Sequence, residues 1–269
     1  MTTPSETAPS PLRTACDVAP AALVTGAAKR IGRALAIDLA AQGWRVGVHY
    51  HRSRADAEAV VREIIEYGGQ AVALQADLAQ ESQVRRLVPE TASALGPLGL
   101  VVNNASLFER DGIADQTRES WDAHLETNLR APLVLIQDFA RQLPSGASGN
   151  VVNLLDQRVW NLTPYFLSYT VSKSALWTLT RTLAMALAPN IRVNGIGPGP
   201  ALRNDRQSEL QFRTQCASVP LRRGTSPEEI CRAVCFILQS PSMTGQMIAL
   251  DGGEHLGWAQ PSRGFVAEE

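Results

Sequence analysis

The segment AALVTGAAKRIG, residues 21–32, joins a short apolar run to the start of a helical pattern through a glycine. The run predicts a buried β-strand, and Leu35 and Leu39 continue one face of the helix that follows. Gly26 permits a tight turn from strand to helix, and Gly32 permits close packing between them. The N-terminus of such a helix presents free N–H groups to a pyrophosphate. The segment therefore predicts the dinucleotide-binding turn of an α/β fold, although the same glycines also suit a turn without a ligand.

Short apolar runs alternate with helical patterns along the rest of the chain. Between two of these runs, Ala57, Val60 and Ile64 mark one face of a helix that ends before Gly68. Near-continuous apolar strands separated by helices are typical of a parallel sheet that is buried on both faces. We therefore expect one Rossmann-like, doubly wound α/β domain over residues 21–269, preceded by a flexible leader over residues 1–20. The seven predicted strands are residues 21–25, 46–49, 71–75, 99–103, 150–155, 191–196 and 246–250.

The composition excludes several classes of protein. Hydrophobic residues make up 45% of the 269 residues, which suits a packed core and argues against a disordered chain. With 25 basic and 26 acidic residues, the chain has no net charge that would attract nucleic acid or an anionic membrane. No apolar stretch is long enough to span a bilayer, and residues 1–20 lack the apolar centre of a secretory signal. The four histidines and four cysteines show no metal-ligand spacing, so we expect a cytoplasmic protein without a metal.

The end of the second predicted strand indicates which dinucleotide binds. An Asp or Glu about 20 residues after the glycines would bind the ribose hydroxyls of NAD. This chain has His51, Arg52 and Ser53 there instead, and a guanidinium can hold a 2′-phosphate through two hydrogen bonds. We therefore expect NADPH/NADP, with a solvated basic loop as the alternative. Asp77 after the third strand is placed to accept from the adenine amine, and Asn104 after the fourth strand faces the cofactor.

Tyr169 and Lys173 lie four residues apart in a helical stretch, so they share one face of a helix. An ammonium beside a phenol favours the phenolate, and we expect Lys173 to lower the pKa of Tyr169. A tyrosine of this kind can donate a proton near neutral pH. Lys29 and Lys173 are the only lysines of the chain, which adds weight to the pair. An ordinary surface contact is the alternative.

Four motifs together resemble the short-chain dehydrogenase/reductase family over residues 21–255: the glycine turn, Asn103-Asn104-Ala105, Tyr169-x-x-x-Lys173 and Pro198-Gly199. The resemblance implies NAD(P)-dependent hydride transfer, with Tyr169 as proton donor and Lys173 gripping the nicotinamide ribose. Asn128 matches the family's asparagine, which kinks a helix and holds a water against the lysine. The expected cofactor-binding residues are Gly26, Arg30, Ile31, Gly32, His51, Arg52, Ser53, Asp77, Leu78, Asn104, Ala105, Ser106, Tyr169, Lys173, Pro198 and Gly199.

Within that family, the chain looks like the pteridine reductases and the bacterial dihydromonapterin reductases. This narrower resemblance rests on the glycine turn, on His49-Tyr50-His51-Arg52-Ser53, on residues 103–108, and on Asp156, where most members have serine. We therefore expect NADPH to reduce a C=N bond of a dihydropterin, dihydromonapterin or dihydrofolate. The expected catalytic residues are Asp156, Tyr169, Lys173 and Asn128.

The same resemblance assigns the substrate contacts. It implies that Phe108 stacks on the pterin ring, that Ser106 hydrogen-bonds it, and that Arg30 contacts both the pterin and a cofactor phosphate. A flat π-system suits stacking on a phenyl ring, whereas a loop anchor is the alternative role for Phe108. The expected substrate-binding residues are Arg30, Ser106, Phe108, Asp156 and Tyr169.

Two other functions stay open. The first is a carbonyl reductase of the same family that acts on a ketone or a 3-oxoacyl thioester; Asp156 argues against it, because an ionised carboxylate cannot donate to an oxyanion. The second is an NADP-binding sensor without turnover. The pocket also departs from the family, since Pro200-Ala201 replaces the Thr or Ser that usually binds the nicotinamide carboxamide.

The family resemblance further implies a homotetramer. It would assemble through the predicted helices over residues 118–143 and 168–188, whose outer faces would meet those of other copies. Trp177 and Leu183 are apolar residues of the second helix that such a contact would cover. We expect residues 200–214 to form a loop that closes over the substrate.

Overall fold

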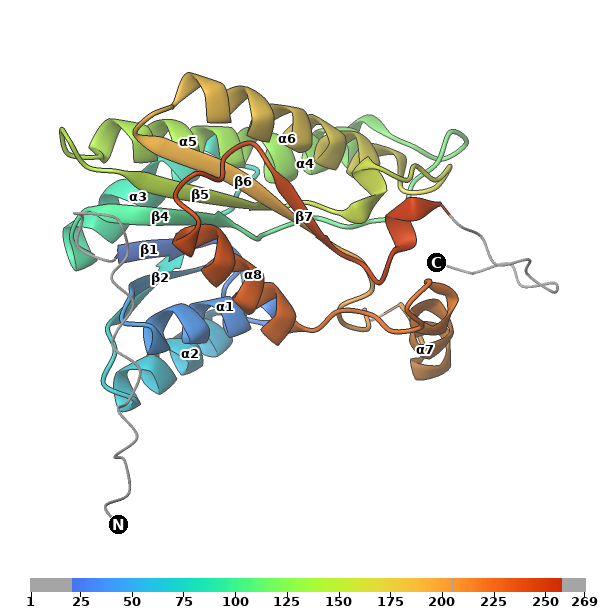
Figure 1. The fold of residues 1–269 in the computed structure, drawn as a ribbon, viewed down its shortest axis with the longest axis horizontal. Coiled ribbons are helices and arrows are strands. Elements are labelled where there is room, and N and C mark those ends of the chain that lie inside the picture. The colour runs from blue at the N-terminus through green and yellow to red at the C-terminus, as the bar shows by residue number, and fades with distance from the viewer. Residues whose placement is uncertain (1–20, 205, 258–269) are drawn as a thin grey trace, which may run out of the picture.

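The structure is a computed structural model that describes residues 21–204 and 206–257, so the expected leader over residues 1–20 lies outside the described residues. One sheet of seven parallel strands forms the centre, in the order β3-β2-β1-β4-β5-β6-β7 (Figure 1). The predicted doubly wound sheet is therefore confirmed. The strands are β1 (Ala21–Val24), β2 (Arg45–Tyr50), β3 (Ala71–Gln75), β4 (Leu98–Asn103), β5 (Gly149–Leu154), β6 (Ile191–Pro198) and β7 (Met247–Leu250).

Helices cover both faces of the sheet (Figure 1). One face carries α1 (Arg30–Ala41), α2 (Arg54–Glu66) and α8 (Pro227–Gln239). The other carries α3 (Glu81–Leu95), α4 (Arg118–Leu125), α5 (Ala131–Gln142) and α6 (Leu167–Ala186). A shorter helix, α7 (Glu209–Ser218), lies away from the sheet near its C-terminal edge, as Figure 1 shows. This is the three-layer arrangement that alternating strands and helices predict.

The period of two along a strand divides the core into two layers. All four residues of β1 are fully buried. Val24 packs in one cluster with Leu35 of α1 and Ile237 of α8. Leu23 points to the opposite face and packs in the second cluster, which contains Phe139 of α5. Each such side chain contributes about 1.5–3 kcal/mol by leaving water, so the near-continuous apolar strands require helices on both sides.

The helix predicted over residues 118–143 contains an irregular turn. A π-helical segment, Glu126–Arg130, separates α4 from α5 without ending the helix. Asn128 lies in this segment and is buried. Because a π-turn inserts one extra residue into the helical ladder, it re-aims a side chain, and such turns are frequent at functional sites. The expected kink at Asn128 is therefore present.

The loop expected over residues 200–214 is shorter than expected. Ser208 caps the N-terminus of α7: its hydroxyl accepts from the N–H of Gln211, and the Gln211 side chain accepts from the N–H of Ser208. This reciprocal pair satisfies two otherwise unpaired donors and starts a helix at Glu209. The expectation of a loop was thus wrong for residues 209–214.

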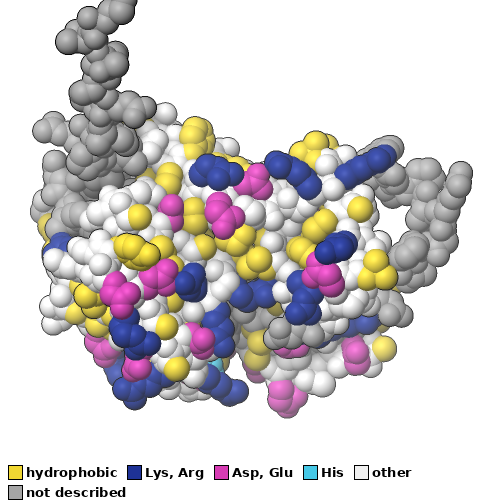
Figure 2. Space-filling view, turned by 90° about the horizontal axis from the view of Figure 1, so that it is seen from below, with side chains coloured by type: hydrophobic (Ala, Val, Ile, Leu, Met, Phe, Trp, Pro, Cys, Tyr) yellow, Lys and Arg dark blue, Asp and Glu magenta, His cyan; other side chains and the backbone are white. Residues whose placement is uncertain are grey.

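The strand order places a binding crevice at one edge of the sheet. The chain runs outward from β1 through β2 to β3 and then returns to pair β4 with the other side of β1. The segments that leave β1 and β4 therefore pass to opposite faces, and ligands bind between such segments at the carboxyl ends of the strands. Figure 2 shows basic and acidic side chains interspersed on one face of the molecule, in keeping with its net charge of −1. No helix in the described part is long and apolar enough to cross a membrane.

Candidate active site

The glycine turn brings α1 against β1 with no room for side chains. Gly26 has a φ of 63°, in the left-handed region where a Cβ is costly. A Cβ at Gly32 would overlap the Gly26 carbonyl oxygen and the Asn104 amide. The Asn104 side chain donates to the Thr25 and Gly26 carbonyls at 2.8 and 3.2 Å, so it fastens the end of β4 to the turn. The predicted cradle thus has the close backbone approach that a pyrophosphate requires.

His49 holds the turn from the neighbouring strand, a role that the sequence analysis missed. Its Nδ1 accepts from the N–H of Gly26 at 3.0 Å, so Nε2 carries the proton and donates to the Ala76 carbonyl at 3.1 Å. Burial lowers the pKa of His49 to about 4 and keeps the ring neutral. The sequence did contain a signal for this role: His49 stands in an apolar strand, and both nitrogens of a buried imidazole need hydrogen-bond partners.

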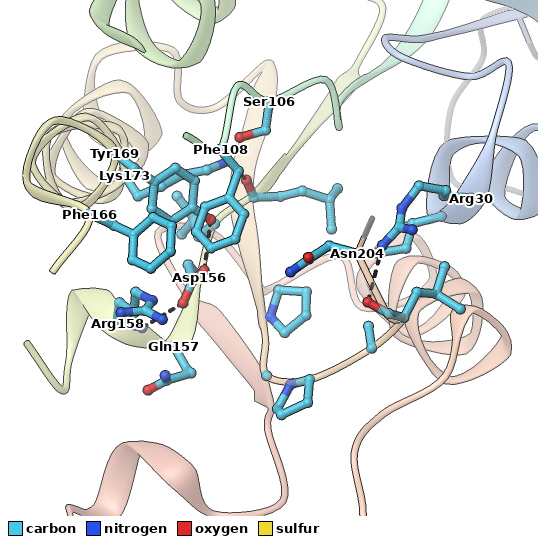
Figure 3. Close-up of a pocket in the computed structure, with 18 of the residues that line it drawn as sticks. Arg30, Ser106, Phe108, Asp156, Gln157, Arg158, Phe166, Tyr169, Lys173 and Asn204 are labelled. Carbon is cyan, nitrogen blue, oxygen red and sulfur yellow. Dashed lines mark hydrogen bonds between the residues drawn. The ribbon is translucent and has the colours of Figure 1, made fainter. Parts of the chain in front are cut away.

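Arg30 starts α1 in a left-handed conformation, with a φ of 55°. Its guanidinium reaches across the pocket and donates to the carbonyls of Arg203 at 2.7 Å and Leu202 at 3.1 Å (Figure 3). It therefore lies between the glycine turn and the segment that follows β6. Contact with a cofactor phosphate and with the substrate stays an expectation for this side chain.

The residues expected around the adenosine end lie together beyond β2 and β3. Arg52 is exposed, and Ser53 precedes α2 without capping it through its side chain. His51 Nε2 lies 3.8 Å from the Asp77 carboxylate, and Asp77 also accepts from the N–H of Ala79 at 3.0 Å. Lys29, the other lysine, forms an exposed ion pair with Asp56 at 3.0 Å. The structure thus leaves the Arg52 guanidinium at the surface, and its contact with a 2′-phosphate stays an expectation.

Tyr169 and Asp156 form a direct pair at the carboxyl edge of the sheet. The Tyr169 hydroxyl donates to Asp156 Oδ2 at 2.7 Å, and the backbone N–H of Arg158 donates to Asp156 Oδ1 at 2.8 Å (Figure 3). Burial raises the pKa of Asp156, because its carboxylate has lost most of its water. Burial, followed by the charge of Asp156, raises the pKa of Tyr169 well above its ordinary value.

The expectation that Lys173 lowers the pKa of Tyr169 was therefore wrong for this arrangement. Lys173 does share the face of α6, but its ammonium donates to the Leu154 carbonyl at 2.7 Å and lies 5.8 Å from the centre of the tyrosine ring. The Tyr169 hydroxyl faces a carboxylate, and a nearby negative charge disfavours the phenolate. Burial also lowers the pKa of Lys173 to about 8.

Asn128 uses its whole carboxamide to join three segments. The amide nitrogen donates to the Leu107 carbonyl at 2.9 Å and to Ser172 Oγ at 3.0 Å. Its oxygen accepts from the N–H of Leu107 at 2.8 Å and from Ser106 Oγ at 3.3 Å. Asn128 thus ties the segment after β4 to α6 without a direct bond to Lys173.

An aromatic wall lies above the Tyr169–Asp156 pair. Phe108 and Phe166 are stacked with ring centres 4.4 Å apart and planes 8° apart, and Phe108 meets Tyr169 edge-on at 4.6 Å. The Arg206 guanidinium lies 5.3 Å from the centre of the Phe108 ring. Phe108 therefore lines the site as expected, but Phe166, which the sequence analysis missed, already covers one of its faces.

The remaining predicted residues surround the same crevice. Leu78 is buried just after β3, Ala105 and Ser106 follow β4, and the Gly199 N–H donates to Leu250 on β7 at 3.0 Å. Ser106 and Gly199 line a cavity of about 280 Å³, which is small for a site that also has to admit a dinucleotide. Residues that line it include Arg30, Ser106, Phe108, Asp156, Tyr169 and Lys173. All the expected catalytic residues except Asn128 border the cavity. In the described part, no cluster of His, Cys, Asp and Glu could hold a metal ion.

Comparison with known proteins identifies the family. Residues 26–255 match a family profile described as enoyl-(acyl carrier protein) reductase. A 3-oxoacyl-(acyl-carrier-protein) reductase from Synechocystis is 32% identical over 236 residues, which cover 86% of this chain and 95% of that protein.

Solved structures are more similar still. The FolM alternative dihydrofolate reductase 1 from Brucella suis, in complex with NADP, has a TM-score of 0.86 and 48% identity over 89% of this chain and 96% of its own. The corresponding protein from Brucella canis, also with NADP, has a TM-score of 0.85 and 46% identity over 90% of this chain and 96% of its own. With its seven-stranded sheet, its glycine turn and its Tyr169–Lys173 helix, the chain belongs to the short-chain dehydrogenase/reductase family of oxidoreductases.

Proposed function

We propose that this protein is an NADPH-dependent reductase that transfers a hydride to a C=N bond of a pteridine. The observation that carries the proposal is the 2.7 Å hydrogen bond from Tyr169 to Asp156 beneath the Phe108 ring. A carboxyl in this place gives the tyrosine a proton source. The Phe108 face that Phe166 does not cover would offer a flat surface to a planar heterocycle once the Arg206 guanidinium moves off the ring. The 48% identity to a FolM dihydrofolate reductase supports the same substrate class.

The cofactor would lie along the crevice from the surface at Arg52 to Lys173. Arg52 and Ser53 would hold the 2′-phosphate, the glycine turn at Gly26 would receive the pyrophosphate, and Lys173 would hold the nicotinamide ribose. Bound NADPH supplies the hydride. The close backbone approach at Gly32 fits this group, since any Cβ there would overlap the turn.

Asp156 and Tyr169 together deliver the proton. The substrate gains a hydride at carbon and a proton at nitrogen, and the proton leaves the Tyr169 hydroxyl. A protonated Asp156 replaces it at once, so no phenolate forms beside a carboxylate. The raised pKa of Asp156 favours this protonated form, and Asp156 takes up a proton from solvent before the next turnover. Proton delivery of this kind contributes about 10²–10⁴-fold to the rate.

A carbonyl reductase is the second candidate, because several similar proteins are named 3-oxoacyl-(acyl-carrier-protein) reductases. A ketone needs a donor for its developing oxyanion, and Tyr169 would supply that proton as well. A protonated Asp156 could resupply Tyr169 with a ketone as well as with a pteridine, so the pair suits both substrates. The 48% identity to a FolM dihydrofolate reductase, against 32% to a 3-oxoacyl-(acyl-carrier-protein) reductase, favours the pteridine.

Absorbance of NADPH during turnover separates the candidates. The purified protein would be mixed with NADPH and, in turn, with a dihydropterin, dihydrofolate, a quinonoid pterin and a 3-oxoacyl thioester. We expect oxidation of NADPH with at least one pteridine and little with the thioester. Turnover of the thioester alone would establish the carbonyl reductase, and binding of NADPH without any turnover would establish a sensor.

We further infer a cytoplasmic homotetramer in which residues 21–269 form one domain. Support comes from the outer face of α6, where Val171 and Met185 are exposed. Trp177 and Leu183, which we also expected there, are partly buried, and Arg181 stacks on Trp177 at 5.0 Å. Light scattering at micromolar concentration tests the tetramer, and a monomeric mass would contradict it.

A further inference from the structure

Arg158 places a full positive charge inside the pocket wall. It lies in the short 3-10 helix η2 (Gln157–Val159), two residues after Asp156, and only 5% of its surface is exposed. A guanidinium stays protonated in proteins, so this charge is permanent. A buried charge is costly unless it is paired and hydrogen-bonded. The surroundings of Arg158 therefore have to compensate for its burial.

The contacts of Arg158 join the two segments that carry the reacting groups. Its backbone N–H donates to Asp156 Oδ1 at 2.8 Å, which leaves Oδ2 for Tyr169. Its guanidinium donates to Thr163 Oγ1 at 2.7 Å and lies 5.1 Å from the centre of the Phe166 ring. One residue thus links the end of β5 to the start of α6.

Phe166 needs such support because its backbone is strained. Its φ is 58°, a left-handed conformation that costs a residue with a Cβ about 1–2 kcal/mol. The ring is held between the Arg158 guanidinium and the stacked ring of Phe108. Phe166 directly precedes α6, so its placement sets where the first turn of α6 puts Tyr169.

The charge of Arg158 also acts on the reacting pair. Burial raises the pKa of Asp156, and Arg158 is the first among the groups that oppose this rise, ahead of Lys173. Arg158 likewise opposes the rise in the pKa of Tyr169. The other charged or titratable groups that line the pocket are Tyr169 and Lys173 of α6, Arg30 of α1 on the opposite side (Figure 3), and Glu254 of the 3-10 helix η3 (Glu254–Leu256). The Arg206 guanidinium lies over the Phe108 ring.

We propose that Arg158 is a positioning residue for the reduction, which aligns Asp156 with Tyr169 through Phe166 and Thr163 and places a fixed positive charge in the pocket wall beside this pair. The proposal rests on the proposed function for its kinetic part. It adds a second cation to the site beside Lys173, whose ammonium donates to the Leu154 carbonyl and acts on Asp156 less strongly than Arg158 does. Proton release from Asp156 to Tyr169 is easier when a fixed charge stabilises the carboxylate that remains.

Two variants separate the charge from the packing. Arg158→Met keeps most of the side-chain volume and the backbone bond to Asp156 but removes the charge, whereas Arg158→Lys keeps the charge. The matched control is Arg110→Met, because Arg110 lies 5.4 Å over the exposed ring of Tyr165, outside the cavity. For each protein, kcat and KM would be measured from pH 5 to pH 10 with the pteridine that the native enzyme reduces.

We expect Arg158→Met to lower kcat at the optimum about tenfold or more, with KM for NADPH unchanged. The descending limb of its pH profile should move to higher pH, because Asp156 keeps its proton longer. At pH values above the native midpoint, the kcat of Arg158→Met relative to its own optimum should therefore be about tenfold higher than the corresponding ratio of the native enzyme. One nearby charge usually shifts a pKa by about one unit, which is a factor of ten. Arg158→Lys should restore the native limb, and Arg110→Met should match the native enzyme throughout. The proposal would be overturned if the descending limb of Arg158→Met stayed at the native pH. It would also be overturned if the limbs of Arg158→Met and Arg158→Lys moved by the same amount.

A second readout is independent of the substrate. Infrared difference spectra across the pH range identify the carboxyl stretch of Asp156 as the band that Asp156→Asn lacks. We expect this band to persist to higher pH in Arg158→Met than in the native protein and in Arg158→Lys. If no pteridine is reduced at all, the proposed function fails while this titration still decides the role of Arg158. An unchanged titration in Arg158→Met would refute that role.

Discussion

The glycine turn and the Asp156–Tyr169 pair lie in one crevice, yet burial has a different consequence at each. At the turn, burial keeps the His49 ring neutral, and both ring nitrogens are paired: Nδ1 accepts from the Gly26 N–H and Nε2 donates to the Ala76 carbonyl. At the pair, burial acts on groups that carry charge, so the pKa of Asp156 rises and the pKa of Lys173 falls to about 8. The turn is arranged to hold a shape, whereas the pair is arranged to move a proton.

The contrast has a physical cause. Neutral hydrogen bonds keep their strength when water leaves, so a buried neutral network fixes one geometry. Burial at the pair instead moves Asp156 and Lys173 toward their uncharged forms, and this brings their pKa values closer to the working pH. We therefore expect changes at the turn to affect binding and stability, and changes at the pair to affect the rate.

The largest effect is expected at Asp156. Asp156→Ser restores the residue that is common in the family and removes the proton source behind Tyr169. Pteridine turnover should fall about 10²–10⁴-fold, while NADPH affinity measured by fluorescence stays at the native value. Activity on ketones should be unchanged or higher. Pteridine reduction at the native rate in this variant would mean that the carboxyl is structural and that the contrast between the two regions does not hold.

The turn should show its own pH dependence, in stability. The pKa of His49 is lowered to about 4 in the folded protein from 6.5, so the unfolded chain takes up a proton first as the pH falls. The contribution of His49 to the unfolding free energy is fully present above pH 6.5. It decreases as the pH falls towards 4, by about 3 kcal/mol in total. Urea unfolding of the native protein and of His49→Gln measures this loss.

We expect the difference in unfolding free energy between the native protein and His49→Gln to narrow as the pH falls from 6.5 towards 4. His51→Gln is the matched control, because His51 is exposed at the end of the same strand, and the loss of its charge near His49 should change the slope far less than His49→Gln does. If the unfolding free energy of His49→Gln falls with decreasing pH as steeply as that of the native protein, another group causes the acid sensitivity.

Cofactor choice should depend on one exposed side chain. Arg52→Ala should weaken NADPH binding about 10- to 100-fold, the size of one or two charged hydrogen bonds, and leave NADH binding nearly unchanged. Titration of both cofactors against intrinsic fluorescence measures the ratio. If the native protein binds NADH and NADPH equally, the assignment of Arg52 to the 2′-phosphate is wrong.

The last expected effect comes from the packing of the turn, and it should leave the proton-transfer chemistry unchanged. Gly32→Ala forces a Cβ onto the Gly26 carbonyl and the Asn104 amide, so the start of α1 has to move. Such overpacking costs about 1–3 kcal/mol, and NADPH binding should weaken with it while the pH profile of kcat keeps its native shape. Gly112→Ala serves as a reference, because a Cβ there would make only an ordinary contact, 3.5 Å from the Asp115 carboxylate. A changed pH profile in Gly32→Ala would show that the two regions are coupled.

The sequence by itself determined the architecture, because its signals are local. Strand alternation, the glycine turn and the four-residue spacing of Tyr169 and Lys173 depend on near neighbours along the chain, and the structure confirms the sheet and the shared helix face. The resemblance to the short-chain dehydrogenase/reductases also rested on short motifs, and the comparisons confirm it.

Only the tertiary structure decided which groups act on one another. Tyr169 faces Asp156 rather than Lys173, Phe166 covers a face of Phe108, and Arg158 lies between the end of β5 and the start of α6. A pKa depends on burial and on charges a few ångströms away, and neither can be read from spacing along the chain. The protonation chemistry of this site is therefore a property of the packed fold, while its location at the ends of the strands was already present in the sequence.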